Sequence, residues 1–295
     1  MKSNQIKGAL WVLAAMLSFS LMSALVKLAS VEVSSVQSVF VRGVVGIIFV
    51  YIAARLKRIS LVGNRRGLLT LRALAGTIAL VLVFYAFTQI PTANAMLLNQ
   101  AVPIFMVPLA VIFLKERTSW HHILFIVAAL CGAALVLKPD INEFSLPGFL
   151  ALLSAFFAAI AYLLVRKLNE TEHHLTIVFW FVTVSTVAVI PLMWDSFVIP
   201  SLKVGLEVLM VGVLGTAGQI FLTLGYRYGE AGRLAVIGST GAVFCALWDY
   251  VLWQHIPDVM TAVGGTIVIV SCVAIQLMRH GETSKHPAQK NSHRN

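Results

Sequence analysis

The chain has 295 residues, of which 59% are hydrophobic and only 12% are charged, and its mean hydropathy is +0.89. A soluble domain carries about 25% charged residues, so this composition excludes a soluble globular protein and indicates an integral membrane protein. The net charge of +10 does not indicate binding to nucleic acid, because the basic residues lie at the ends of apolar stretches, where they set membrane topology.

Ten apolar stretches follow one another along the chain, and each is long enough to cross a hydrocarbon core of about 30 Å as a helix. Helices satisfy their own backbone hydrogen bonds, which lipid cannot do. The predicted fold is therefore all-α, with no separate soluble domain and a polar cytoplasmic tail at 279–295. The predicted spans are 8–29, 35–54, 68–88, 93–114, 120–137, 147–166, 174–194, 204–225, 233–253 and 258–278.

Lysine and arginine are distributed unequally between the two sides of the predicted bundle. Eighteen of them, Arg72 included, are assigned to one side, and three, Lys27, Lys138 and Lys203, to the other. Because basic loops stay in the cytoplasm, both termini are predicted to be cytoplasmic. An even number of spans agrees with this orientation.

The two halves of the chain resemble each other. Residues 84–120 and 222–258 share one plan, in which the end of a span is followed by a short polar break, a full span and another polar loop. Residues 8–27 also resemble residues 148–167. Five spans per half is an odd number, so the halves are predicted to be inverted repeats, a common plan of secondary transporters. The predicted repeats cover 8–138 and 147–278.

Several motifs point to one family. They are FVRG at 40–43 with Gly46, and the run FYAF…IPTANAMLLNQAVPIFMVPLAVIFLKER. Together with the repeated five-span unit, over residues 8–278, they resemble the EamA family of the drug/metabolite transporter superfamily. The second half departs from the family pattern where Gln254 stands in place of an acidic residue. The resemblance implies a ten-helix carrier that moves small metabolites, often outward, by alternating access, and it does not identify the cargo.

Two charged residues lie well inside predicted spans, where charges are costly and tend to mark function. Arg42 lies about 10 Å inside the outer end of its span, and Asp249 about 6 Å inside the outer end of its own. Similar depths allow the two to pair. The pair is interpreted as a gate or a site for a charged or zwitterionic substrate, or else as a structural ion pair or two side chains that reach water separately. Lys27 lies nearer the surface and is expected to extend to water.

Polar residues also interrupt the span at 93–114. Asn99 and Gln100 lie about 10 Å below the outer surface, and unpartnered amides in lipid are unfavourable. They are therefore expected to face another helix or a water-filled cavity. Pro103 and Pro108 can kink the helix and free carbonyls to line such a cavity. By the repeat, Gly238-Ser239-Thr240-Gly241 is expected to border the same cavity from the other half.

Four further residues inside predicted spans carry polar groups and are weaker candidates for substrate binding. Aromatic rings at such places can stack on a cargo, although more often they pack against other helices or mark the membrane interface. These candidates are Tyr85, Tyr162, Trp180 and Gln219.

The sequence contains no G-x-x-x-x-G-K-[ST] loop, which leaves an ion gradient, a proton gradient or the substrate gradient as the energy source. The first hypothesis is a secondary active transporter of a bacterial-type inner membrane, which exports or exchanges a small polar metabolite such as an amino acid or a related zwitterion. Asp249 is the best candidate to carry a coupling proton. A homodimer is left open.

The alternatives are a multidrug, vitamin or nucleoside carrier of the same fold, a passive pore, or an intramembrane enzyme. An enzyme needs a convergent set of nucleophile, base or metal ligands at one depth, and one Asp with one Arg does not make that set. No catalytic residue, metal site or cofactor is therefore predicted. The predicted partners are a small-molecule substrate and the lipid bilayer.

Overall fold

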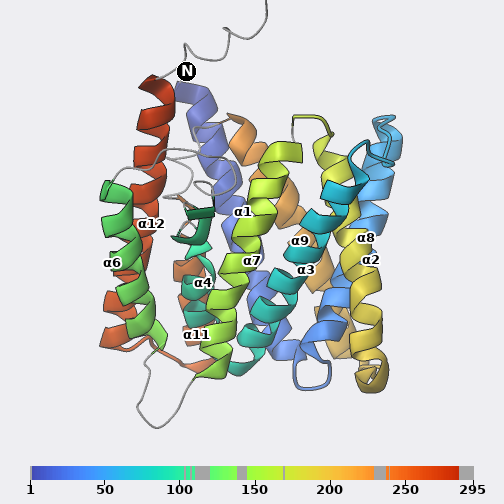
Figure 1. The fold of residues 1–295 in the computed structure, drawn as a ribbon. Coiled ribbons are helices and arrows are strands. Elements are labelled where there is room, and N and C mark those ends of the chain that lie inside the picture. The colour runs from blue at the N-terminus through green and yellow to red at the C-terminus, as the bar shows by residue number, and fades with distance from the viewer. Residues whose placement is uncertain are drawn as a thin grey trace, which may run out of the picture.

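The protein is a bundle of long helices (Figure 1). The computed structural model describes residues 2–102, 104–106, 108–109, 120–137, 145–168, 170–228, 237–238 and 240–285. Ten helices have described bounds, and each falls on one of the ten predicted spans; further helical residues lie at 102, 104–106, 108–109 and 237–238. The ten helices are α1 (Lys2–Ala29), α2 (Ser35–Leu56), α3 (Arg66–Gln89), α4 (Thr92–Asn99), α6 (Trp120–Leu137), α7 (Leu146–Leu168), α8 (His174–Met193), α9 (Leu202–Tyr228), α11 (Thr240–Trp253) and α12 (Val259–Lys285), with a short 3₁₀ turn, η1, at Trp194–Ser196.

Six of these helices contain stretches long and apolar enough to cross a membrane: Ile6–Ala29, Ser35–Leu56, Arg66–Gln89, Leu146–Val165, His174–Ser196 and Leu202–Leu222. Three shorter apolar stretches lie in α6, α11 and α12. The prediction of an all-α integral membrane protein is confirmed, and the count of ten crossings stays a prediction. Helix α12 continues to Lys285, past the predicted start of the cytoplasmic tail at 279, and the bounds of the tail stay a prediction.

Local chemistry sets several helix ends. Ser34 precedes α2, and its hydroxyl accepts the backbone N–H of Gln37 at 3.2 Å. His173 precedes α8 in the same way, with Nδ1 accepting the N–H of Leu175 at 3.2 Å. Side chains of this kind satisfy the N–H groups that the first turn of a helix leaves without partners.

The helices pack in a pattern that repeats between the two halves of the chain. Helix α1 packs against α9 as α7 packs against α3, α2 packs against α9 as α8 packs against α3, and α1 packs against α11 as α7 packs against α4. The pairs α2 with α8, α4 with α11 and α6 with α12 join counterparts directly. Exchanging the first five helices for the last five reproduces each of these contacts.

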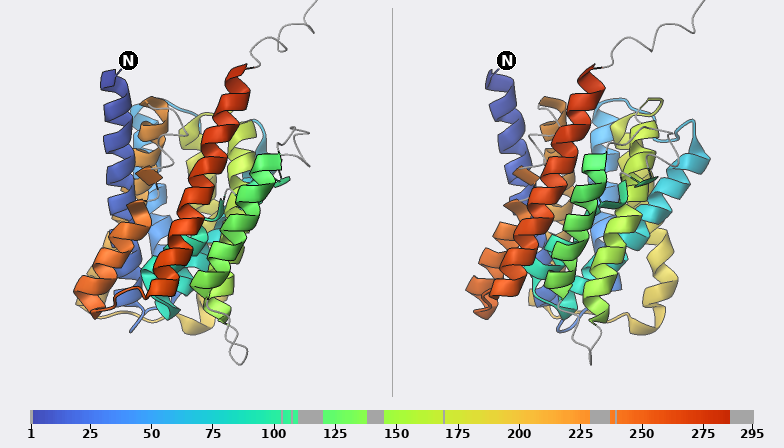
Figure 2. Two further views of the ribbon diagram at one scale, coloured as in Figure 1. Left: turned by 90° about the vertical axis from the view of Figure 1, so that its left-hand side faces the viewer. Right: turned by 60° about the vertical axis from the view of Figure 1, so that its left-hand side comes forward.

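The chain begins and α12 ends at the same end of the bundle (Figures 1 and 2). This end also carries the 57–65 loop, in which Lys57, Arg58 and Arg65 lie exposed, and we call it the basic end. The opposite end carries the turns at 30–34, 90–91 and 254–258, and we call it the far end.

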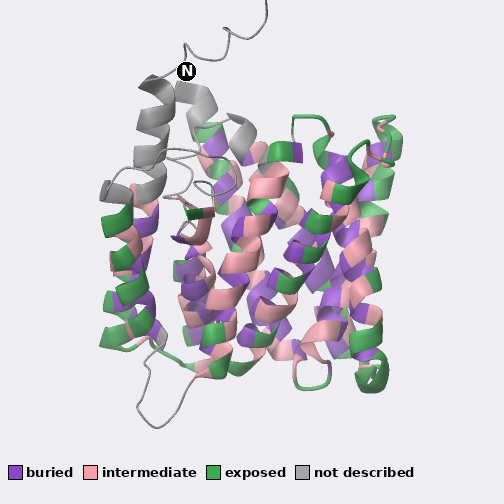
Figure 3. Ribbon diagram, viewed as in Figure 1, coloured by how far each residue is buried: buried purple, intermediate pink, exposed green. Residues whose placement is uncertain are grey.

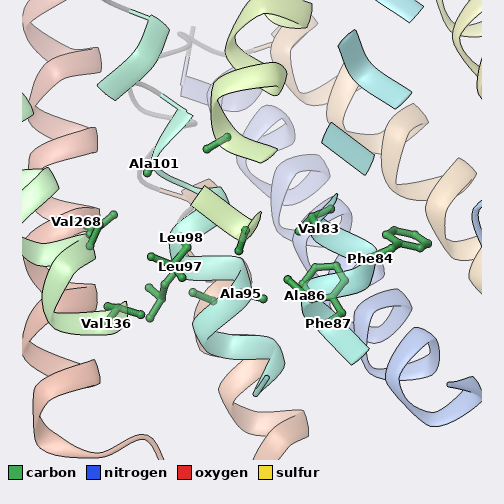
Figure 4. Close-up of a cluster of buried hydrophobic side chains, with 14 of the residues drawn as sticks. Val83, Phe84, Ala86, Phe87, Ala95, Leu97, Leu98, Ala101, Val136 and Val268 are labelled. Carbon is green, nitrogen blue, oxygen red and sulfur yellow. The ribbon is translucent and has the colours of Figure 1, made fainter. Parts of the chain in front are cut away.

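Apolar side chains fill the interior between α3, α4, α6 and α12. Figure 4 shows Phe84 and Phe87 of α3 on one side of Leu97 and Leu98 of α4. On the other side of α4 lie Val136 of α6 and Val268 of α12. The α6–α12 contact is close, because a Cβ on Gly132 would come within 2.7 Å of the Gly264 carbonyl oxygen. Small residues allow such an approach in membrane bundles.

The perimeter is also apolar. Large hydrophobic side chains such as Ile48, Val127, Val243 and Val270 are more than half exposed on different helices, and exposed residues lie along the flanks of the bundle (Figure 3). A soluble monomer rarely exposes so much contiguous apolar surface. The perimeter is suited to lipid, so the polar groups that remain inside the bundle are the candidates for function.

Candidate functional site

Helix α4 breaks in the middle of its predicted span. Regular helix ends at Asn99, and the following residues form a turn in which Ala101 N–H donates to the Leu98 carbonyl at 3.1 Å. Pro103 has no N–H to donate to the Asn99 carbonyl four residues earlier, and its ring disfavours helix there. The break therefore lies one turn before Pro103, which itself lies outside the described residues. Irregular backbone at membrane depth is tolerated only within protein or beside water.

The amide side chains at this break bond to the other half of the chain. Asn99 Nδ2 donates to Ser154 Oγ of α7 at 2.8 Å, and Ser154 is fully buried. Gln100 Nε2 donates to the Gly238 carbonyl at 3.2 Å. A Cβ on Gly241 would lie 3.8 Å from Gln100 Nε2, so the start of α11 borders the end of α4.

The remaining residues of this group lie beside the break or outside the described residues. Thr240, at the start of α11, bonds locally to the Ile237 carbonyl at 2.6 Å. Ser239 lies outside the described residues. Gln100 thus bonds Gly238 and borders Gly241, while Asn99 bonds α7, and the two halves of the chain are joined at this level. The cavity that the repeat predicts there stays a prediction.

Asp249 caps α4 from a different helix. It lies on α11 with an exposed fraction of 0%, and its Oδ1 accepts the Thr92 hydroxyl at 2.9 Å. Its Oδ2 accepts the Ala93 backbone N–H at 2.8 Å. These donors belong to the first turn of α4, where the helix dipole favours a negative charge. The carboxylate therefore fastens α11 to the N-terminus of α4 at the far end.

Lys27 strengthens the same junction. Its Nζ donates to the Ile90 carbonyl at 3.1 Å and lies 4.7 Å from the centroid of the Trp253 ring. Its charge is close enough to Asp249 for the two to interact electrostatically. Lys27 is half-buried, and its ammonium group bonds the 90–91 turn, so the expectation that it extends to water stays a prediction. We call Lys27, Thr92, Ala93 and Asp249 the far-end latch.

The expected pairing of Arg42 with Asp249 is not seen among the described residues. Both carboxylate oxygens of Asp249 bond α4, and the Nε and Nη1 atoms of Arg42 are buried with no hydrogen-bond partner. The two residues belong to different parts of the bundle, since α2 lies on the right of Figure 1 and α11 on the left.

Arg42 lies instead beside a second arginine that the sequence reasoning placed at the basic end. Arg72 of α3 has an exposed fraction of 8%, and Arg42 of α2 one of 4%. The guanidinium carbons lie 4.2 Å (Arg72) and 5.9 Å (Arg42) from the centroid of the Phe181 ring of α8. We call Arg42 and Arg72 the arginine pair. The sequence could have indicated that Arg72 is buried, because Arg72 lies inside the predicted span 68–88.

The weaker candidates separate into different roles. Tyr162 of α7 interacts electrostatically with Arg72, and 47% of its surface is accessible. Trp180 Nε1 donates to the Leu61 carbonyl at 3.1 Å, which anchors the loop at the basic end. Tyr85 of α3 is 36% exposed, and Gln219 of α9 is half-buried. Tyr162 is thereby linked to the arginine pair.

Comparison with known proteins assigns the scaffold. The EamA-like transporter family matches the chain twice, over residues 6–138 and 146–277. The chain belongs to the EamA-like transporter family. The resemblance seen in the FVRG and FYAF motifs is thus confirmed, as is the family's two-repeat layout.

Curated relatives agree with this assignment. The pseudopaline exporter CntI of Pseudomonas aeruginosa is 34% identical over 276 residues, covering 93% of this chain and 97% of that protein. Human solute carrier family 35 member G1 is 26% identical over 300 residues, covering 94% and 81%. The S-adenosylmethionine uptake transporter of Rickettsia prowazekii is 25% identical over 209 residues, covering 70% of each chain.

A solved crystal structure matches with a TM-score of 0.61 at 18% identity, covering 91% of this chain and 98% of that chain, and it supports the fold alone. From the family and these relatives, the EamA-like protein is a multi-pass membrane transporter of the drug/metabolite type and not an enzyme.

Proposed function

We propose that this EamA-like protein is a secondary active transporter that exports or exchanges a small polar metabolite, such as an amino acid or a related zwitterion, by alternating access. The observation that carries the proposal is the break in α4, where Asn99 and Gln100 bond Ser154 and the Gly238 carbonyl of the other half. Interrupted helices at the interface of two repeats hold the substrate sites of many carriers. The pseudopaline exporter, with 34% identity, favours the outward direction.

The packing of the helices supports inverted repeats. The contacts of α1 with α9 and α11, and of α2 with α9, recur as contacts of α7 with α3 and α4, and of α8 with α3. Together with the ten predicted spans, this supports two five-helix repeats of opposite topology. Such repeats can exchange conformations, and this exchange opens a central site to each side in turn.

The far-end latch fits one state of this cycle. Asp249 and Lys27 fasten α11 and α1 to the start of α4, so this conformation is closed at the far end. By the positive-inside rule the basic end faces the cytoplasm, which places both termini there and the far end outside, in a bacterial-type inner membrane. The latch then prevents the site from opening outward until its bonds are broken.

Everted membrane vesicles from overexpressing cells test the proposal. They would be incubated with a mixture of polar metabolites from a cell extract, with and without a protonophore, and their contents measured by mass spectrometry. A secondary exporter accumulates at least one compound with saturable kinetics, and the protonophore or loss of the opposing gradient abolishes accumulation. Uptake that never saturates would indicate a pore, and uptake equal to that of vesicles without the protein would contradict transport of polar metabolites.

A further inference from the structure

We propose that the arginine pair binds the substrate, and that the substrate carries at least two carboxylate groups. This assignment rests on the proposed transport function and narrows its substrate class. It differs from a plain zwitterion site, in which one positive and one negative residue receive opposite charges of the cargo.

The first evidence is that buried nitrogen atoms of both guanidinium groups have no hydrogen-bond partner among the described residues. In each arginine, the Nε and Nη1 atoms are buried with no hydrogen-bond partner. Ser38, one turn before Arg42 on the same face of α2, has a buried hydroxyl that also lacks a partner. Buried polar groups in folded proteins are normally satisfied, so a cluster of unsatisfied donors marks a place for a ligand rich in acceptors.

The second evidence is the charge balance. The charged or titratable groups that act on Arg72 are Tyr162 and Arg42, and no carboxylate of the described residues is among them. Two positive charges therefore lie close together without a counter-ion in this part of the chain. The face of Phe181 offers each only a weak cation–π contact. A zwitterion brings no net negative charge, whereas a substrate with two carboxylates can neutralise both arginines.

The surroundings are shaped to hold the arginines. A Cβ on Gly215 of α9 would lie 2.6 Å from Arg42 Nε, so only glycine leaves room for this side chain. Tyr162, which interacts electrostatically with Arg72, adds a hydroxyl that can donate to a carboxylate.

Carboxylates match the planar shape of the two guanidinium groups. The two guanidiniums come from different helices, α2 and α3, and both lie over one aromatic ring. Each planar guanidinium can bind one carboxylate through two parallel hydrogen bonds. A substrate with two carboxylates separated by a short linker can bind both guanidinium groups, one carboxylate to each. Its linker would then lie near Phe181.

Binding to the purified full-length protein in lipid nanodiscs tests the assignment. Thermal unfolding would be measured in metal-free buffer with millimolar iminodiacetate, L-glutamate or citrate, and compared with L-alanine and inorganic phosphate at equal ionic strength. A ligand that binds only the folded protein raises its unfolding temperature. We expect a rise with at least one of the three polycarboxylates and none with alanine.

The variants Arg42→Met and Arg72→Met keep much of the side-chain volume and remove the charge. Each should weaken polycarboxylate binding by about tenfold or more, the change that 1.4 kcal/mol produces. Arg55→Gln, at an exposed arginine of α2, is the matched control and should bind as the natural protein does.

Four outcomes would overturn the assignment: equal effects of alanine and the polycarboxylates, an effect of phosphate alone, an effect that persists in both methionine variants, or no effect of any polycarboxylate. Because binding is measured without transport, these outcomes leave the proposed transport function standing. A protein that binds polycarboxylates and yet moves nothing in vesicles would instead contradict transport.

Discussion

Replacing Asp249 by alanine should open the far end of the bundle. The substitution removes two hydrogen bonds to a charged acceptor and leaves the buried Ala93 N–H without a partner. The Thr92 hydroxyl can rotate toward another acceptor, so most of the cost comes from the backbone N–H and the lost charge. A hydrogen bond to a charged group contributes about 1.5–3 kcal/mol, and an unsatisfied buried donor costs about 1–3 kcal/mol.

The net effect on the closed state is smaller than the sum, because water satisfies the same groups once the far end opens. We expect Asp249→Ala to destabilise the closed form relative to the open form by about 2–4 kcal/mol, which changes their equilibrium constant by roughly 30- to 700-fold.

Cys245 provides a natural reporter of this opening. It lies one turn before Asp249 on α11, is fully buried, and its sulfur is 3.4 Å from the Ser23 hydroxyl. In a variant with Cys131 and Cys272 replaced by alanine, a membrane-impermeant maleimide added from the far side would label Cys245 only when this region opens. Asp249→Ala should raise the labelling rate by roughly 30-fold or more.

The exposed Asp195 of η1 supplies the control, since Asp195→Ala removes an acidic residue near the same end without touching α4. Equal labelling rates in Asp249→Ala and Asp195→Ala would refute the reasoning, because the carboxylate would then not hold the far end closed.

Three further predictions follow from the contacts inside the bundle. Arg72→Met should raise the free energy of unfolding of the ligand-free protein by about 1–3 kcal/mol, because it removes an unpaired buried charge. Arg55→Gln should change the free energy of unfolding little. A lower stability of Arg72→Met would contradict the inference that Arg72 has no counter-ion. Asn99→Ala should lower the free energy of unfolding by only about 0.6 kcal/mol, because the Ser154 hydroxyl keeps its hydrogen bond to a backbone carbonyl. A loss of stability several times larger, measured by thermal unfolding, would show that Asn99 belongs to a wider hydrogen-bond network. Gly132→Val should separate α6 from α12 and destabilise the protein by about 1–3 kcal/mol, and unchanged unfolding would mean that this contact is not tight.

Hydropathy alone was enough to predict the all-α membrane fold, because lipid imposes one requirement, internal backbone hydrogen bonding, on every span. Pro103 and Pro108 were expected to be able to kink the span at 93–114, and α4 ends at Asn99, four residues before Pro103. Proline acts on the carbonyl four residues before it, so the end of the helix agrees with an effect of Pro103.

The partners of the charged residues could not be predicted, because they depend on which helices meet. Similar depth suggested that Arg42 pairs with Asp249, yet α2 and α11 lie in different parts of the bundle. The donors that Asp249 binds, at the start of α4, are backbone and hydroxyl groups with no charge in the sequence. Arg72 was counted with the basic end, although its place inside a span carried the information that it is buried.

A comparison of metabolites in cells and medium shows directly whether this protein moves a polar metabolite that the arginine pair binds. One strain would overexpress the natural protein and another Arg72→Met at equal membrane levels, with Arg55→Gln as the control. We expect that at least one compound with two or more carboxylates moves from cells to medium in the natural and Arg55→Gln strains and not in the Arg72→Met strain. The same shift in all three strains, or a shift confined to neutral or cationic compounds, would contradict it.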